Sequence, residues 1–142
     1  MRRPGIAMVT ALFPPSIGGI QSHTHHLAQK LARRGLEVHV VTREVPGAPR
    51  SEVTGNVHVH REGSGTASFI AGALRRLHAL RSRFDVLHAH QLLSPTTIAI
   101  LFRLFSDKRI LLNPHASGSV GDVQTLRRQG PLGEARLALA RR

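Results

Sequence analysis

"FPPSIGGIQSHTHHLAQKLARRG", residues 13–35, joins a turn to a helix, and the rest of the chain is interpreted from it. Two prolines and two adjacent glycines form the turn, and apolar residues then recur with helical spacing at Ile20, Leu27, Ala28, Leu31 and Ala32. Glycines at the start of a helix leave free backbone N–H groups open to an anion such as a phosphate. From the spacing alone, a wide turn that needs glycine only for its geometry explains the pattern equally well.

Short apolar runs alternate with amphipathic segments along the whole chain. We expect strands at Ile6–Thr10, Glu37–Thr42, Val57–His60, Val86–His90 and Arg109–Asn113. Helices should fill the intervals, the third with Ser94 as its N-cap, and a further helix should begin near residue 131. The Pro- and Gly-rich segment 43–55 is expected to be a loop. This alternation predicts βαβ units, and hence an α/β fold with a Rossmann-like, doubly wound parallel sheet in a single domain, residues 1–142.

Composition limits the classes of partner and of site. The chain has 142 residues and no cysteine, which excludes disulfides and thiolate metal sites. Its net charge of +12 favours anionic partners, although a general preference for arginine over lysine explains the charge equally well. No apolar stretch approaches the ~18 residues of a membrane span, and the apolar N-terminal run lacks a signal-peptide cleavage site. We therefore expect a cytoplasmic protein.

A second glycine-rich turn, "GSGTAS" from Gly63, nearly matches the dinucleotide-binding fingerprint. Its third small position is Ser68, and Asp85, about 20 residues on, precedes its strand instead of ending it. A carboxylate there could not reach a ribose hydroxyl from the ligand side of the sheet. We therefore predict no dinucleotide at this turn.

Three motifs together carry a resemblance to a known family. They are the opening stretch through "LEVHVVT", the strand "FDVLHAHQ" and the strand "RILLNPHASG". Together they resemble the N-terminal domain of GT-B glycosyltransferases of the family-four, retaining type, over roughly residues 6–123. The resemblance implies transfer of a sugar from a nucleotide-sugar donor to a sugar or lipid-linked acceptor, without a cofactor. It also implies that the C-terminal nucleotide-sugar domain is absent from these 142 residues, so we expect the fragment to be inactive alone.

The resemblance assigns roles to the loops at the carboxyl ends of the strands, where ligands bind in such sheets. Gly18 and Gly19 match the turn that approaches the donor diphosphate and the acceptor. His115 matches the histidine that faces the sugar undergoing transfer, and we take it as the catalytic candidate. Residues 116–118, Ala-Ser-Gly, depart from relatives that have Gly or Asp directly after this histidine.

Further substrate-binding candidates lie on the fourth expected strand. His88 and His90 match the strand that lines the acceptor side, and Gln91 follows them directly. His23 matches a histidine common on the first helix, and we expect it to point inward. We predict no metal, because carboxylate partners are few and none has ligand spacing. His58 and His60 are expected to be packing or solvated strand residues.

The basic residues of the second helix leave several partners open. Arg75, Arg76, Arg81 and Arg83 lie opposite its apolar stripe, as in a solvated face or a surface that contacts anionic lipid at the membrane periphery. No nucleic acid is expected, since no recognition motif or aromatic platform accompanies the charge. The main alternative to a glycosyltransferase domain is a non-catalytic α/β module that binds a phosphorylated ligand; a basic nucleic-acid-binding protein is the third.

Overall fold

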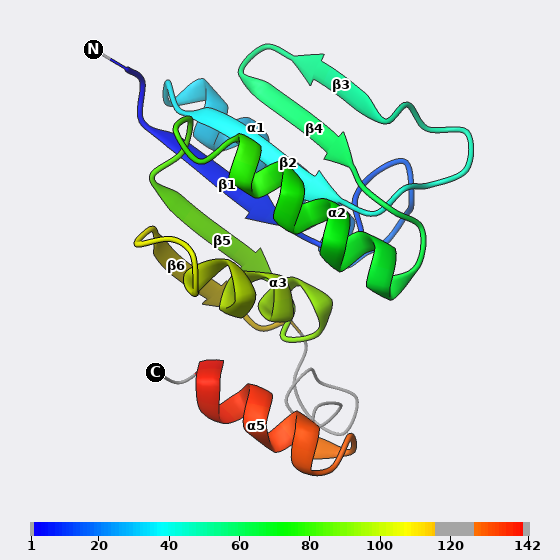
Figure 1. Ribbon diagram of the computed structural model, residues 1–142. Helices are drawn as coiled ribbons and strands as arrows, with labels where there is room; N and C mark the ends of the chain where they lie inside the picture. The colour runs from blue at the N-terminus through cyan, green and yellow to red at the C-terminus, as the bar shows by residue number, and fades with distance from the viewer. Residues whose placement is uncertain (1, 116–126, 141–142) are drawn as a thin grey trace.

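The computed structural model describes residues 2–115 and 127–140 of the chain. Six strands form one sheet in the order β3-β4-β2-β1-β5-β6 (Figure 1). All neighbouring pairs are parallel except β3 and β4. The strands are β1 (Gly5–Val9), β2 (Glu37–Thr42), β3 (Ser51–Thr54), β4 (Val57–Arg61), β5 (Val86–His90) and β6 (Arg109–Asn113). The predicted Rossmann-like α/β sheet is confirmed, and its five predicted strands lie where expected.

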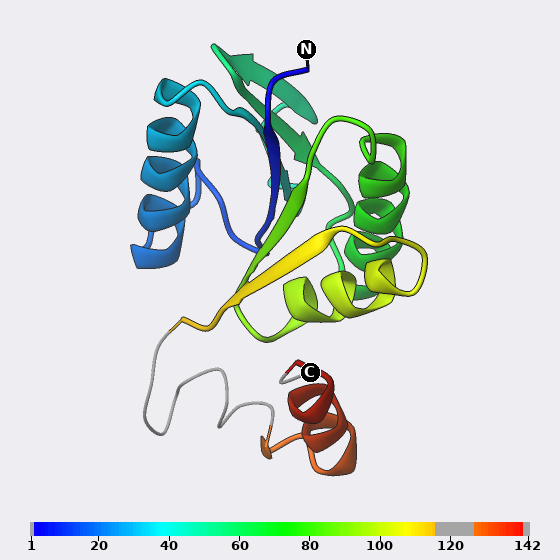
Figure 2. The same ribbon diagram turned by 90° about the vertical axis from the view of Figure 1, so that its left-hand side faces the viewer.

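Helices cover both faces of the sheet. Figure 2 shows α1 on one face, and α2 and α3 together on the other. Successive side chains of β1 point to opposite faces, so Met8 packs with α1 while Val9 packs with α2 and α3. The described helices are α1 (Gly19–Arg33), α2 (Thr66–Ala79), α3 (Ser94–Arg103) and α5 (Pro131–Ala140). None of these described helices is long and apolar enough to cross a membrane.

Strand β3 lies in the segment that we expected to be a loop, and that prediction was wrong. All four of its residues are exposed, so no alternation of buried and exposed positions marks it. Backbone pairing with β4 holds it at the sheet edge, through a two-residue turn at Gly55 and Asn56. Gly55 has φ 59, which suits glycine. A glycine–asparagine pair between two short runs is a hairpin signal, and it is the feature that could have revealed the strand.

The start of α3 also differs from the prediction. Ser94 is the first helical residue and Leu93 takes the cap position, without a side-chain hydrogen bond. The chain turns sharply before it, because Gln91 has φ 78 and its carbonyl accepts a 2.9 Å hydrogen bond from the Thr96 hydroxyl. The Ser94 hydroxyl instead accepts a 3.4 Å hydrogen bond from Arg43. The end of β5 is therefore joined to α3 by a tightly bonded turn at the carboxyl edge of the sheet.

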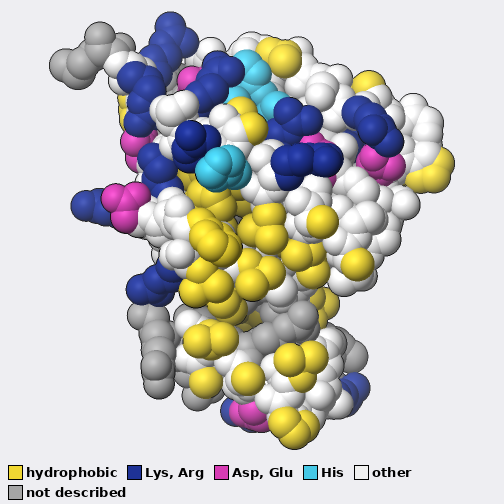
Figure 3. Space-filling model, in the orientation of Figure 1, with side chains coloured by type: hydrophobic (Ala, Val, Ile, Leu, Met, Phe, Trp, Pro, Cys, Tyr) yellow, Lys and Arg dark blue, Asp and Glu magenta, His cyan; other side chains and the backbone are white. Residues whose placement is uncertain are grey.

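Apolar side chains gather on the surface around α3 and α5 (Figure 3). Leu104 and Phe105, just after α3, are 70% and 81% exposed. Leu139 of α5 closes one side of a cavity of about 610 Å³ against α3 and β6. This side of the described domain is an apolar surface larger than scattered single residues would make.

Candidate functional site

The turn before α1 exposes the start of the helix at the carboxyl end of β1. Gly18 takes the cap position without a side-chain cap, and its carbonyl accepts the Ser22 N–H at 3.0 Å. A Cβ added to Gly19 would meet nothing within 4 Å, whereas one added to Gly18 would lie 2.4 Å from the Gln21 Oε1. Of the two predicted glycines, Gly19 therefore provides the open approach, and Gly18 makes room for Gln21.

His88 and His90 both point to the α1 face of the sheet. Leu87 and Ala89, which alternate with them, belong to the core on the other face. Strand β5 lies between β1 and β6, so both histidines are buried, with His90 0% exposed. Their ring centroids are 4.0 Å apart. The two residues therefore share one face of the sheet, and His90, at the strand end, lies nearer the ligand edge.

Three histidines from distant segments meet at this edge, and we call His23, His90 and His115 the site cluster. His90 Nδ1 lies 3.2 Å from His115 Nε2. The His23 ring centroid is 5.4 Å from that of His115 and 6.0 Å from that of His90. One nitrogen of each ring lies within 4.8 Å of the others, so these three are the described residues whose geometry could hold a metal ion. His23 was expected to point inward, and it does face the other two rings from α1.

Burial sets the protonation state of the two histidines on β5, His88 and His90. It lowers the pKa of His90 from its usual 6.5 to about 3, helped by the nearby charges of His88, His115 and His23. Burial likewise lowers the pKa of His88. Both rings are neutral at neutral pH, so each carries one N–H donor and one lone pair. His90 is fully buried and its Nδ1 is engaged with His115, so it orients the His115 ring and does not contact a ligand hydroxyl itself.

Gln91 lies beside the site cluster in a different hollow. This pocket of about 370 Å³ is lined by Ala11, Leu12, Arg43, Thr66, Gln91, Leu93, Ser94 and Gln129. Arg43 crosses it, stacks over the Phe69 ring at 5.5 Å and donates to the Thr66 hydroxyl at 3.2 Å. The sequence analysis did not single out Arg43, although it follows β2 directly and so occupies the carboxyl end of a parallel strand. Its place at the carboxyl end of a parallel strand was the feature of the sequence from which Arg43 could have been predicted.

The arginines at the α2 end of the molecule are mostly paired. Arg76 and Arg75 both contact Glu62, at 2.6 and 3.8 Å. Arg83 forms an ion pair with Glu37. The charge available to an anionic membrane surface is smaller than the sequence indicates, and such contact stays a prediction.

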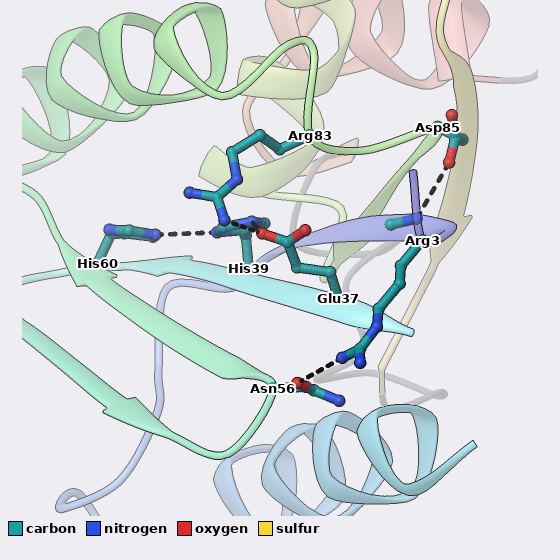
Figure 4. A network of polar contacts seen from close by, with 8 residues as sticks. Arg3, Glu37, His39, Asn56, His60, Arg83 and Asp85 are labelled. Carbon is teal, nitrogen blue, oxygen red and sulfur yellow. Dashed lines mark hydrogen bonds and ion pairs between the residues drawn. The ribbon is translucent and has the colours of Figure 1, made fainter. Parts of the chain in front are cut away.

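A second group of histidines lies on the opposite face of the sheet, and we call His39, His58 and His60 the sheet cluster. Figure 4 shows the His60 ring directed at His39 and the His39 ring directed at the Glu37 carboxylate. Arg83 contacts the same carboxylate. His39 Nδ1 lies 3.2 Å from His60 Nε2, and His39 Nε2 lies 2.9 Å from a Glu37 oxygen. The His58 ring stacks on His39 at 4.8 Å. The prediction that His58 and His60 pack on the strand is consistent with this network.

Comparison with known proteins agrees with the observed fold. The model of Glycosyltransferase Family 4 matches residues 17–142. Sucrose-phosphate synthase from Thermosynechococcus elongatus has a similar fold, with TM-score 0.72 and 16% identity over 97% of this chain. A second structure of that protein gives TM-score 0.65 and 16% identity, covering 95% of this chain and 68% of the other. This chain spans 39% of the longer of the two.

No curated protein matches the chain. At 16% identity the two structures establish the fold, a GT-B Rossmann-like N-terminal domain, and the family model covers far more than half of the sequence. The resemblance found from the sequence motifs is thereby confirmed. The chain belongs to glycosyltransferase family 4.

Proposed function

We propose that this chain is the acceptor-side domain of a retaining glycosyltransferase. A second domain outside these 142 residues would bind the nucleotide-sugar donor and complete the cleft. The observation that carries the proposal is the meeting of His90 and His115 at the carboxyl edge of the sheet, 3.2 Å apart, on the face that α1 also occupies. Family membership supports a sugar donor and an acceptor as the general substrates.

Each predicted site residue has a role in this proposal. The α1 start at Gly19 offers backbone N–H groups and the positive end of a helix dipole to the donor phosphates. The leaving diphosphate gains negative charge during transfer, so these groups act most strongly in the transition state. His115 contacts the sugar undergoing transfer, and His90 holds the His115 ring. His88 and Gln91 line the acceptor side.

The test compares this chain with the full-length protein that contains it. We expect the full-length protein to turn over a nucleotide-sugar donor and the 142-residue chain alone to show no turnover. Gly19→Val in the full-length protein should cut kcat/KM severely with the fold intact, because its branched side chain would occupy the open space at the helix start. Clear turnover by the short chain, or a wild-type rate for Gly19→Val, would refute the proposal.

The same comparison distinguishes a glycosyltransferase from the alternative function, a non-catalytic binding module. A non-catalytic module would bind a phosphorylated ligand in both forms and turn over no donor in either. We place the protein in the cytoplasm, with membrane contact, if any, at the α2 arginines. A vesicle-binding assay with anionic lipid checks that point independently of turnover.

A further inference from the structure

We propose that the site cluster is a binding site for Zn²⁺ or a similar transition-metal ion. The sequence analysis predicted no metal, because carboxylate ligands are scarce. Three imidazoles with an open fourth position are, however, a sufficient ligand set for zinc. His23, His90 and His115 offer one nitrogen each within 4.8 Å of one another, and this inference stands apart from the proposed sugar transfer.

The distance between two of the rings matches a metal site. A zinc–nitrogen bond of about 2.0–2.1 Å in tetrahedral geometry places two ligand nitrogens about 3.3–3.4 Å apart. His90 Nδ1 and His115 Nε2 lie 3.2 Å apart without any ion. The spacing of these two nitrogens therefore already suits a metal ion, and rotations of the two rings would turn their lone pairs from each other towards the ion.

The third ligand is the adjustable one. His23 is exposed on α1, and its ring lies at similar centroid distances from both partners, 5.4 and 6.0 Å. A rotation of this side chain can bring its nitrogen to the ion, whereas His90 is fixed by complete burial. The fold thus holds two ligand side chains, His90 and His115, close together, and the third, His23, turns towards the metal.

The chemistry of the ligands selects the ion and limits its affinity. Imidazole nitrogen suits Zn²⁺, Cu²⁺ and Ni²⁺, whereas Mg²⁺ and Ca²⁺ prefer oxygen ligands. His90 Nε2 is buried and forms no hydrogen bond in the described structure, so no acceptor supports its far N–H when Nδ1 binds a metal. We therefore expect binding weaker than at a structural zinc site. Since the same rings face the proposed sugar position, bound zinc would block that position.

Titration calorimetry of the untagged 142-residue chain with ZnCl₂ tests the proposal. We expect one Zn²⁺ per chain, an affinity at least about tenfold lower in His23→Gln and in His115→Gln, and no competition from MgCl₂. His25→Gln is the matched control, since His25 lies on the same helix and is not one of the three ligands. Its affinity should equal that of the wild type.

Equal zinc affinities in wild type, His23→Gln and His115→Gln would overturn the proposal, and so would an equal loss in His25→Gln. Neither result depends on sugar transfer, so failure of the zinc proposal can be distinguished from failure of the proposed function. Circular dichroism of each variant shows whether the fold is kept, which is expected for His23→Gln because His23 is exposed on α1. His25 is half-buried beside the Phe13 ring, so the control also reports any loss caused by disturbed packing of α1.

Discussion

The two histidine clusters occupy opposite faces of one sheet and differ in what satisfies their ring nitrogens. In the sheet cluster, His39 is bonded at both nitrogens, to His60 and to Glu37, and Arg83 pairs with the same carboxylate. In the site cluster, His90 Nδ1 faces His115 Nε2, and the group of three that could hold a metal among the described residues contains no carboxylate. Nothing in the residue type itself distinguishes the two.

This difference teaches how one residue type serves two purposes. A buried ring whose donor and acceptor are both occupied stabilises the fold and has nothing left for a ligand. A ring group at the carboxyl edge, where one member, His23, is exposed, can be reached by a ligand. Substitutions should therefore cost stability in the sheet cluster and ligand binding in the site cluster.

The largest effect on stability should come from His39→Ala. His39 is 0% exposed, and its removal leaves a cavity and deprives Glu37 of a donor. We expect a loss of about 2–5 kcal/mol in the free energy of unfolding, measured by urea denaturation. His23→Ala, on the exposed side of the other cluster, should change it by less than about 0.5 kcal/mol. Equal losses in the two variants would remove the distinction between the clusters.

A smaller effect is expected from the partner carboxylate. Glu37→Leu leaves the buried His39 Nε2 without an acceptor and should cost about 1–3 kcal/mol. Glu37→Gln keeps an acceptor oxygen and should cost less. Arg83 is half exposed, so the ion pair itself contributes little. If Gln destabilises as much as Leu in the same denaturation assay, the charge rather than the hydrogen bond holds the network.

Acid should weaken both clusters. Burial lowers the pKa of His60 to about 4 and of His90 to about 3, from 6.5. The unfolded chain takes up protons below about pH 6.5 while these folded rings do not, so stability is full above that pH and falls as the pH drops towards 4. Urea midpoints measured across this window should show the decline, and it should be shallower in His60→Asn. A stability independent of pH in this window would contradict the buried, neutral rings.

The smallest effect concerns the turn that leads to the site cluster. Gly19→Ala adds a Cβ into open space, so we expect the unfolding free energy to change by less than about 0.5 kcal/mol. Gly63→Ala is its counterpart, since its φ is 62 and the added Cβ would lie 2.4 Å from the Ser68 backbone. A thermal-unfolding comparison should show a clear loss only for Gly63→Ala. A comparable loss at Gly19 would mean that this glycine serves the fold.

The sequence predicted the fold because buried parallel strands and amphipathic helices leave strong patterns. Strand β3 left no such pattern, since its residues are all exposed, and its backbone pairing with β4 and the Glu52–Arg61 ion pair follow no local periodicity. The meeting of His90 and His115, two of the three residues in the site cluster, could also have been predicted from the sequence. In the observed register His90 is opposite Asn113, which brings His115 to the end of β5, but this follows only once β5 and β6 are known to be neighbours.

The inward direction of His23 was expected from the resemblance, because the residues alone do not fix the rotation of α1, which packing against the core decides. Two other contacts could not be predicted. Arg83 reaches Glu37 from the segment after α2, across a distance in sequence that no local pattern describes. The position of Arg43 was visible in the sequence, whereas its stacking on Phe69 needed the packed helix.

The most direct test of the central claim is the steady-state rate of the proposed full-length glycosyltransferase with one histidine replaced in each cluster. His115→Ala should lower kcat and kcat/KM together by about 100-fold, as expected for a contact made in the transition state. His58→Ala, on the opposite face, should keep kcat within about twofold of the wild type. Wild-type turnover by His115→Ala, or an equal loss in both variants, would contradict the assignment of the site cluster to catalysis.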